Sequence, residues 1–345
     1  MQKKVFIYGG LYKTATEFIA ENYIEKLDKE KFEVFTFYKG KNNIFYHTFL
    51  KVLYSDLSLD QGKKIISDIM SDIKKPNIII QSSGFFGHRH NGHSDFNKRF
   101  DVMEKLFNNP KYIVVLRDQK TSIYSQWVAG IKKRVKISFD EYTSADESFV
   151  KKQNILNCKE ITNYKMFDYG LFLNPYIELY KDKEKSRVIF LIYEELKSNP
   201  DIFFKKLSNF INVIDLKFKI DFSYKNKSNK LEETNLLGFI LFKKTHVFIL
   251  TLIYRIYIVF KFFGFDVNMK LPYQNYKFEK TLNSFSMIYL NFLDKVIFKF
   301  LFKKKLKVYY KNKINRIEEI GSFYKKKNME LDKKINLELN KFNYY

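Results

Sequence analysis

The stretch Tyr112–Trp127, which reads YIVVLRDQKTSIYSQW, decides the fold. It opens with Tyr112–Leu116, an apolar run without polar alternation, which is typical of a parallel strand covered on both faces. Apolar residues at helical spacing follow, so we expect a helix to begin near Lys120. Arg117 stands where the strand ends, and Ser125 falls in the second turn of that helix. A cation at a strand-to-helix turn predicts an anion site at the carboxyl end of a parallel sheet.

Four other short runs, rich in isoleucine, valine and phenylalanine, also lack alternation. They are Lys4–Tyr8, Val34–Tyr38, Asn77–Gln81 and Val188–Tyr193. Helical patterns lie between the runs, and two of them show a clear apolar stripe. The stripes consist of Ala20, Tyr23, Ile24 and Leu27, and of Ile123, Tyr124, Trp127, Val128 and Ile131. Alternating strands and helices predict an α/β fold with a P-loop-like, doubly wound parallel sheet.

This sheet is predicted to fill a domain of residues 1–228, and a helical C-terminal region of residues 229–345 follows it. Within that region Leu236–Phe265 is very apolar but carries lysines and an arginine, and its uncharged runs are too short to span a bilayer. Two interpretations remain open. Either an aromatic-rich helical lobe packs on the core, or an interfacial helix lies on an anionic membrane. The tail is predicted to be helical, with apolar positions at Ile314, Ile317, Ile320 and Tyr324.

Composition narrows the class of protein. The chain has 345 residues, a formal net charge of +24 and 46% apolar residues, so it can bury a core and attract anions. A codon bias toward Lys, Asn, Ile and Phe accounts for part of that charge. The lysines are spread along the chain, which argues against a nucleic-acid partner. Cys158 is the only cysteine, which favours a reducing cytoplasm, and the apolar part of the N-terminal MQKKVFIYGG is too short for a signal peptide.

A second strand-to-helix turn lies in Tyr8–Phe18, YGGLYKTATEF. The strand is expected to end at Tyr8, Gly9 and Gly10 turn the chain, and we expect a helix to begin near Thr14. Helix amides, the charge of Lys13 and the hydroxyls of Thr14 and Thr16 then form a cradle for a phosphate. It is not a Walker A loop, which needs an earlier glycine and Gly-Lys-Ser/Thr. Two anion sites at the carboxyl ends of neighbouring strands fit a nucleotide phosphorylated at both ends of its ribose.

These residues resemble the family of sulfotransferases that use 3′-phosphoadenosine 5′-phosphosulfate (PAPS), in particular bacterial enzymes that sulfate surface glycans. The family's 5′-phosphosulfate loop, Lys-[Ser/Thr]-Gly-Thr-[Thr/Ser], is similar to Lys13-Thr14-Ala15-Thr16-Glu17. Its 3′-phosphate motif, an Arg and a Ser eight residues apart, is similar to Arg117 and Ser125. Val188–Val213 resembles the family's strand, Tyr-Glu-Asp/Glu-Leu sequence and following helix. The resemblance covers the predicted core domain and, more loosely, Tyr324–Tyr345.

The resemblance implies PAPS as the donor, no metal, and an in-line transfer similar to phosphoryl transfer. It implies a donor site made of Gly10, Lys13, Thr14, Ala15, Thr16, Glu17, Arg117, Ser125 and Tyr193. Lys13 is also expected to be catalytic, because it would neutralise the leaving phosphate oxygen. Tyr193 is expected to contact the adenine. Glu194 would orient backbone or lysine groups or cap the next helix, and Tyr224–Lys230 would close over the nucleotide.

Two positions depart from the family pattern. Ala15 replaces the usual glycine, so we expect its methyl group to crowd the backbone near the phosphate. Glu17 replaces a hydroxyl residue and brings a negative charge beside a dianion. Unless Glu17 points away and pairs with a lysine, it lowers the affinity for the donor.

The acceptor hydroxyl needs a base to take its proton. The loop Gln81–Phe96, QSSGFFGHRHNGHSDF, offers His88, His90 and His93 as candidates, with His88 favoured. A glutamate that the resemblance places near Gly84 is missing here, which makes a histidine base more attractive. Two alternatives remain open. The loop is merely solvated, or its His-x-His-x-x-His pattern binds metal, although the metallo-hydrolase pattern has an aspartate where this chain has a glycine.

The sequence therefore predicts a bacterial, cytoplasmic sulfotransferase with a glycan or glycolipid acceptor and a further contact with an anionic membrane. Aromatic rings and lysines suit a sugar chain with acidic substituents. A P-loop nucleotide phosphotransferase is one alternative, but it needs a carboxylate for Mg²⁺ at a strand tip. The strand tips carry Tyr8, Gln81, Arg117 and Tyr193. A basic membrane-associated binding protein is another alternative; it explains the charge but not the ordered motifs.

Overall fold

The computed structural model describes residues 3–11, 13–37, 43–87, 95–132, 139–144, 164–181, 186–213 and 303–345. Three predicted features lie outside these residues: Leu236–Phe265, Tyr224–Lys230 and the three candidate histidines. The two interpretations of Leu236–Phe265 therefore stay open. Among the helices of the described ranges, none has both the length and the apolar character needed to cross a bilayer.

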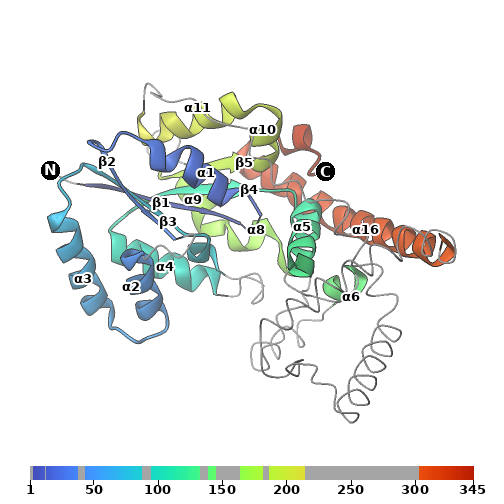
Figure 1. The fold of residues 1–345 in the computed structure, drawn as a ribbon, viewed down its shortest axis with the longest axis horizontal. Coiled ribbons are helices and arrows are strands. Elements are labelled where there is room, and N and C mark those ends of the chain that lie inside the picture. The colour runs from blue at the N-terminus through green and yellow to red at the C-terminus, as the bar shows by residue number, and fades with distance from the viewer. Residues whose placement is uncertain are drawn as a thin grey trace, which may run out of the picture. The chain divides into compact units, whose positions relative to one another are not determined.

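Five parallel strands form the sheet, in the spatial order β2-β3-β1-β4-β5 (Figure 1). Their bounds are β1 (Lys4–Gly10), β2 (Phe32–Thr36), β3 (Asn77–Gln81), β4 (Lys111–Leu116) and β5 (Val188–Ile192). This arrangement confirms the predicted α/β fold with a doubly wound parallel sheet. β1 pairs with β4 although β2 and β3 come between them in the chain. The winding of the sheet reverses between β1 and β4, and ligands of such sheets bind at this kind of switch point.

Three predicted strand ends are wrong. The first strand ends at Gly10, two residues after the predicted end. The second strand ends at Thr36, two residues before the predicted end. Tyr193 does not end the fifth strand but begins helix α10 (Tyr193–Ser198). The ladder between β4 and β5 stops at the pair Leu116 and Ile192. Beyond that pair the backbone has no strand partner, so its hydrogen bonds are made within a helix instead.

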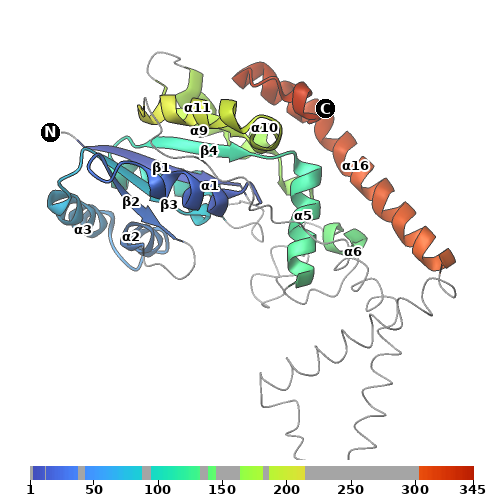
Figure 2. The ribbon, with the colours of Figure 1, turned by 45° about the horizontal axis from the view of Figure 1, so that its top comes forward.

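Helices cover both faces of the sheet, which explains why the strands are uniformly apolar. One face carries α1 (Thr16–Asn22), the 3₁₀ helix η1 (Ile24–Lys26), α10 and α11 (Pro200–Ile211). The other face carries α2 (Ile44–Leu53), α3 (Leu59–Asp72), α4 (Phe96–Phe107), α8 (Tyr169–Phe172) and α9 (Asn174–Lys181). In Figure 2 the sheet lies between α11 above and α2 and α3 below. The remaining elements described are η2 (Ser83–Phe86), α5 (Gln119–Lys132), α6 (Phe139–Thr143), η4 (Tyr164–Met166), α16 (Lys303–Ile335) and η6 (Leu339–Phe342).

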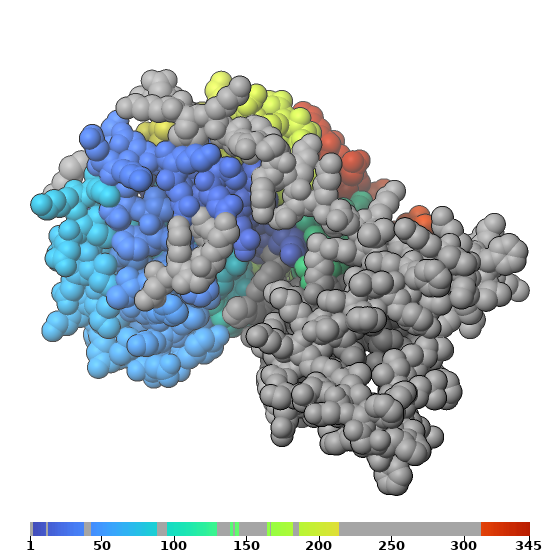
Figure 3. All heavy atoms as spheres, in the orientation of Figure 1, coloured from blue at the N-terminus to red at the C-terminus, as the bar shows by residue number. Residues whose placement is uncertain are grey.

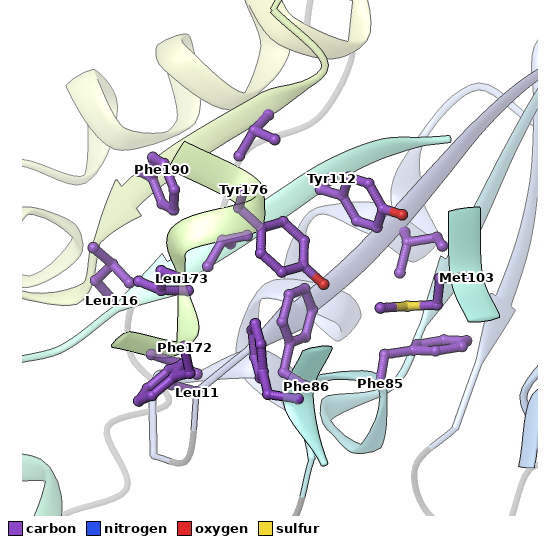
Figure 4. Close-up of a cluster of buried hydrophobic side chains, with 14 of the residues drawn as sticks. Leu11, Phe85, Phe86, Met103, Tyr112, Leu116, Phe172, Leu173, Tyr176 and Phe190 are labelled. Atoms are coloured by element: carbon purple, nitrogen blue, oxygen red, sulfur yellow. The ribbon is translucent and has the colours of Figure 1, made fainter. Parts of the chain in front are cut away.

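The larger core cluster is aromatic. Figure 4 shows Phe86, Tyr112 and Tyr176 gathered where α9 packs on the sheet. The rings of Tyr112 and Tyr176 meet edge to face at 4.9 Å. The Tyr112 hydroxyl donates to the carboxylate of Glu104 at 2.7 Å, and Arg187 binds both oxygens of the same carboxylate at 3.0 and 2.8 Å. This ion pair joins α4 to the amino ends of β4 and β5.

The chain divides into two compact units. The first contains Met1–Gln126, Tyr142–Lys225 and Ile317–Tyr345, and it holds the whole sheet. Blue and cyan atoms in Figure 3 mark the surface that the N-terminal part of this unit forms. Residues near the C-terminal end belong to its core, because Leu331, Ile335, Leu339 and Tyr344 are all buried there. The second unit contains Trp127–Glu141 and Asn226–Arg316. The predicted boundary near residue 228 stays a prediction.

Candidate anion-binding site

The turn after β1 is tightly wound. Lys13 and Ala15 both have left-handed backbone conformations, with φ of 66° and 58°. Ala15 is the residue that precedes the first turn of α1. The predicted helix is shorter than expected, since α1 ends at Asn22 and the chain continues as η1. A helix of two turns has a small dipole, so the attraction for an anion must come mainly from full charges.

Gly10 is required by close packing in this turn. A Cβ atom on Gly10 would lie 1.9 Å from the Thr14 hydroxyl oxygen and 2.6 Å from that of Thr16. Thr14 is fully buried, and its hydroxyl donates to the carbonyl of Leu11 at 2.6 Å. The two threonine hydroxyls also lie 3.2 Å apart, within hydrogen-bond distance. Thr14 therefore stabilises the loop from inside, whereas Thr16 is only partly buried.

The charged residues of the loop face solvent. Lys13 is exposed immediately before the buried Thr14. Glu17 is exposed in the first turn of α1, where a negative charge is favourable to the helix. The partly buried Ala15 occupies a left-handed conformation that glycine adopts at much lower cost. The replacement of the family's glycine by Ala15 therefore affects the backbone conformation of the loop.

Arg117 joins this loop to the turn after β4. It is 9% exposed, and its Nη1 donates to the carbonyl of Lys13 at 2.7 Å. Its Nε donates to the Thr121 hydroxyl at 3.3 Å. Gly10 on β1 is the register partner of Val115 on β4, so the two turns leave adjacent strands at the same level. The structure therefore brings the two predicted anion sites together.

Ser125, which was predicted to reach the same anion as Arg117, is not among the hydrogen-bond partners of Arg117 in the described residues. Ser125 lies partly buried on α5, while Thr121 accepts the bond from Nε. The Thr121 hydroxyl in turn donates to the carbonyl of Asp118 at 3.0 Å. Thr121 was missed in the sequence, although its position four residues after Arg117 places it in the first turn of the predicted helix. A role for Ser125 in binding the donor stays a prediction.

Tyr193 lies beneath the guanidinium of Arg117. The Arg117 Cζ atom is 4.5 Å from the ring centroid, and the Lys197 Nζ atom is also 4.5 Å from it. Such cation–π contacts stabilise and orient the cation. A contact of Tyr193 with the adenine stays a prediction, but the ring already has a structural role.

Two carboxyl groups lie next to the arginine: that of Asp118 is buried, and that of Glu194 is partly buried. Asp118 precedes α5, and its Oδ2 accepts from the Thr121 backbone N–H at 3.2 Å. Glu194 Oε1 accepts from the Asp118 backbone N–H at 3.3 Å, so Glu194 orients backbone, one of the predicted roles. Burial raises the pKa of both carboxyls, and the charge of Arg117 offsets part of that rise. The turn that carries Arg117 is thus built on a buried polar network.

Comparison with known proteins identifies the family. Residues 10–235 match the model of the sulfotransferase domain, so this chain belongs to the sulfotransferase domain family. The match begins at Gly10 and includes both turns. It confirms the predicted sulfotransferase fold and assigns the chain to enzymes that transfer sulfuryl groups.

Three of the solved structures that are similar to this chain are as follows. One is a sulfotransferase from Alicyclobacillus acidocaldarius (TM-score 0.45, 14% identity, 70% of this chain and 92% of that one). A second is mouse sulfotransferase SULT7A1 complexed with PAP (TM-score 0.32, 12% identity, 69% and 67%). A third is the sulfotransferase domain from the curacin biosynthetic pathway (TM-score 0.29, 16% identity, 63% and 76%). A comparison with curated proteins found no significant match.

Proposed function

We propose that this protein transfers a sulfuryl group from PAPS to a hydroxyl or amine of a glycan or lipid-linked saccharide. Membership of the sulfotransferase domain family supports the reaction class. The observation that carries the choice of donor is the hydrogen bond from Arg117 to the Lys13 carbonyl. It joins two cation-bearing turns at the switch point of the sheet, where a doubly phosphorylated nucleotide is the fitting ligand.

The residues present suit the two anionic ends of PAPS. Among the described residues, the hydrogen-bond partners of Arg117 are a carbonyl and a hydroxyl rather than a carboxylate. Within the part of the chain that the structure describes, no carboxylate touches its guanidinium and no hydrogen bond engages Nη2, so Nη2 is assigned to a phosphate oxygen. Lys13 supplies the second charge on the adjacent turn. Arg117 is assigned to the 3′-phosphate and Lys13 to the 5′-phosphosulfate.

When bound, PAPS would supply the sulfuryl group and a phosphate as leaving group. Lys13 is assigned the role of neutralising the negative charge that develops on the leaving oxygen in the transition state. A base must take the proton of the acceptor hydroxyl as the new sulfur–oxygen bond forms. We keep His88, His90 and His93 as candidates for that base; they lie outside the described residues.

An aromatic surface at the carboxyl edge of the sheet supports a sugar acceptor. Phe37 directly follows β2 and is 40% exposed. The ring of the exposed His47 meets the Phe37 ring edge to face, with the centroids 5.6 Å apart. The centroid of the Tyr46 ring lies 4.9 Å from that of Phe37. Aromatic rings of this kind stack on the apolar faces of pyranoses. The net charge of +24 suits acidic substituents and a location at the inner face of an anionic membrane.

The proposal is tested by transfer of radiolabelled sulfate from PAPS to glycan and glycolipid extracts of the source cell. We expect label in a saccharide fraction with the parent protein. Lys13→Ala should lower turnover by about 100-fold or more, as the loss of a group that stabilises transition-state charge does. Lys29→Ala is the matched control, since Lys29 is an exposed lysine that precedes β2 at the opposite edge of the sheet. Equal turnover in Lys13→Ala and Lys29→Ala would remove Lys13 from the reaction, and absence of PAPS-dependent label in every extract would contradict the acceptor class.

A further inference from the structure

Residues far along the chain return to the turn that carries Arg117. The side-chain amides of Asn328, on α16, and Gln119, at the start of α5, exchange two hydrogen bonds at 2.8 and 3.0 Å. Asn328 also donates to the carbonyl of Tyr344 at 2.9 Å. Lys120 Nζ donates to the carbonyl of Asn343 at 3.1 Å. Two successive residues of the first turn of α5 are therefore bound to residues 328–344.

Tyr344 reaches further, to the carboxylate behind Arg117. Its side chain is buried, and its hydroxyl donates to Glu194 Oε2 at 3.1 Å. The other oxygen of the same carboxylate accepts from the Asp118 backbone N–H. A phenol from the C-terminal segment and an amide from the Arg117 turn thus share Glu194. Glu194 is partly buried, and hydrogen bonds to a carboxylate are stronger than those between neutral groups.

Glu194 and Tyr169 hold the backbone of Arg117 from two sides. The carbonyl of Arg117 accepts from the Tyr169 hydroxyl at 2.5 Å, and the next peptide N–H, that of Asp118, donates to Glu194. Glu194 also follows Tyr193, whose ring lies under the guanidinium. A displacement of Glu194 would therefore move both the backbone and the aromatic support of the arginine.

We propose that Tyr344 is a positioning residue of the donor site: by holding Glu194 it fixes the orientation of Arg117 and so sets the affinity for the donor's 3′-phosphate. This inference rests on the proposed function, because it assigns the 3′-phosphate to Arg117. Tyr344 contacts no part of the donor in this role. It acts through two hydrogen bonds, from its own hydroxyl and from the Asp118 amide, on one carboxylate.

The test is Tyr344→Phe, which removes only the hydroxyl. Binding of adenosine 3′,5′-bisphosphate and of adenosine 5′-monophosphate is measured by calorimetry on the full chain. The second ligand lacks the 3′-phosphate, so the ratio of the two affinities reports on Arg117. We expect the ratio to fall by roughly 3- to 30-fold, the range for residues that act on a site without touching the ligand.

Tyr345→Phe is the matched control. Its hydroxyl also donates to a carboxylate, that of Asp332, at 2.9 Å. The same atom is lost from the adjacent residue, but Asp332 lies on α16 and holds the backbone of Leu337 and Leu339 instead of the Arg117 turn. The ratio of the two affinities should stay at the parent value in this variant.

A second variant covers the case that Tyr344→Phe does not fold. Glu194→Gln keeps the shape of the side chain and should lower the same ratio. If both fold, Tyr344→Phe should add little in the Glu194→Gln background, because both changes act on one contact. An unchanged ratio in Tyr344→Phe, or additive effects of the two changes, would overturn the inference. If the parent itself does not prefer the bisphosphate, the proposed function fails instead.

Discussion

Arg117 combines charge with a fixed position, and both depend on named contacts. Its guanidinium is bound by the Lys13 carbonyl, the Thr121 hydroxyl and the Tyr193 ring. Three unlike partners on separate elements restrict the side chain to one orientation. An arginine held in this way binds an anion without losing much conformational entropy, which increases affinity.

Removing this side chain should weaken binding of the donor nucleotide. Arg117→Ala is expected to reduce the affinity for adenosine 3′,5′-bisphosphate by about 2–5 kcal/mol, as loss of a buried charged partner does. The affinity for adenosine 5′-monophosphate should fall by less, through the lost bond to the Lys13 carbonyl. Calorimetric titration measures both. Arg187→Ala is the control, since Arg187 precedes β5 at the amino edge of the sheet. A loss of affinity of the same size in this variant would show that Arg117 has no specific role in binding the nucleotide.

Glu194 gives the stability a testable pH dependence. Burial raises the pKa of its carboxyl in the folded state, so the folded chain holds this proton to higher pH than the unfolded chain. The contribution of Glu194 to stability therefore decreases as pH rises from its unfolded pKa through the raised folded pKa. Glu194→Gln lacks this loss. The variant should become more stable relative to the parent as pH rises above about 4.5, the ordinary pKa of this carboxyl, measured by chemical denaturation; a constant difference would show that Glu194 does not titrate differently on folding.

At the scale of elements, the backbone at the start of α1 is strained, and the methyl group of Ala15 is the cause. Ala15 is left-handed, which costs an L-residue about 1–2 kcal/mol, while glycine loses about 0.5–1 kcal/mol more chain entropy on folding. Ala15→Gly should therefore increase the free energy of unfolding by about 0.5–1 kcal/mol. Ala20→Gly, within right-handed α1, should decrease it by about 1 kcal/mol or more. Thermal and denaturant unfolding of the pair decide the point; a loss of stability at both positions would mean that the turn tolerates alanine without strain.

The strands were predictable because each is a short apolar run that owes its character to burial on both faces. Asn77–Gln81 was predicted to the residue, and the other runs to within two residues at either end. The start of a helix was harder to predict, since the residues around Tyr193 suit a strand as well as a helix. The placement of the two turns at neighbouring strand ends followed from the motif order and parallel pairing, but the hydrogen bond from Arg117 to the Lys13 carbonyl did not. The role of Tyr169 did not follow either, because nothing in its neighbourhood marks a hydroxyl that binds a backbone carbonyl elsewhere.

At the scale of the whole molecule, the C-terminal residues complete the core that the sheet begins. Leu339 and Tyr344 are buried in the same cluster as β4, α8 and α9. The tail was expected to be helical, and Ile320 and Tyr324 are indeed buried, while Ile314 is 51% exposed. Its contacts with Gln119 and Glu194 were not predictable, because short polar side chains at such separation give no periodic signal.

Truncating one buried side chain in this segment should destabilise the sheet-bearing unit. Leu339→Ala is expected to cost about 2–5 kcal/mol of unfolding free energy, as for other fully buried leucines. Ile314→Ala, on the exposed face of α16, should stay within about 0.5 kcal/mol of the parent. Denaturant unfolding followed by circular dichroism compares the two. Equal stability of Leu339→Ala and the parent would mean that η6 separates from the core without loss.

The pairing of Gln119 with Asn328 spans 209 residues of sequence. During synthesis at ~5–20 residues per second, the beginning of α5 leaves the ribosome roughly 10–40 s before its amide partner exists. In the later part of that time, once β5 has been made, all five strands are available while the contacts of Gln119 with the C-terminal segment are still missing. The turn that carries Arg117 is thus completed later than the sheet from which it leaves.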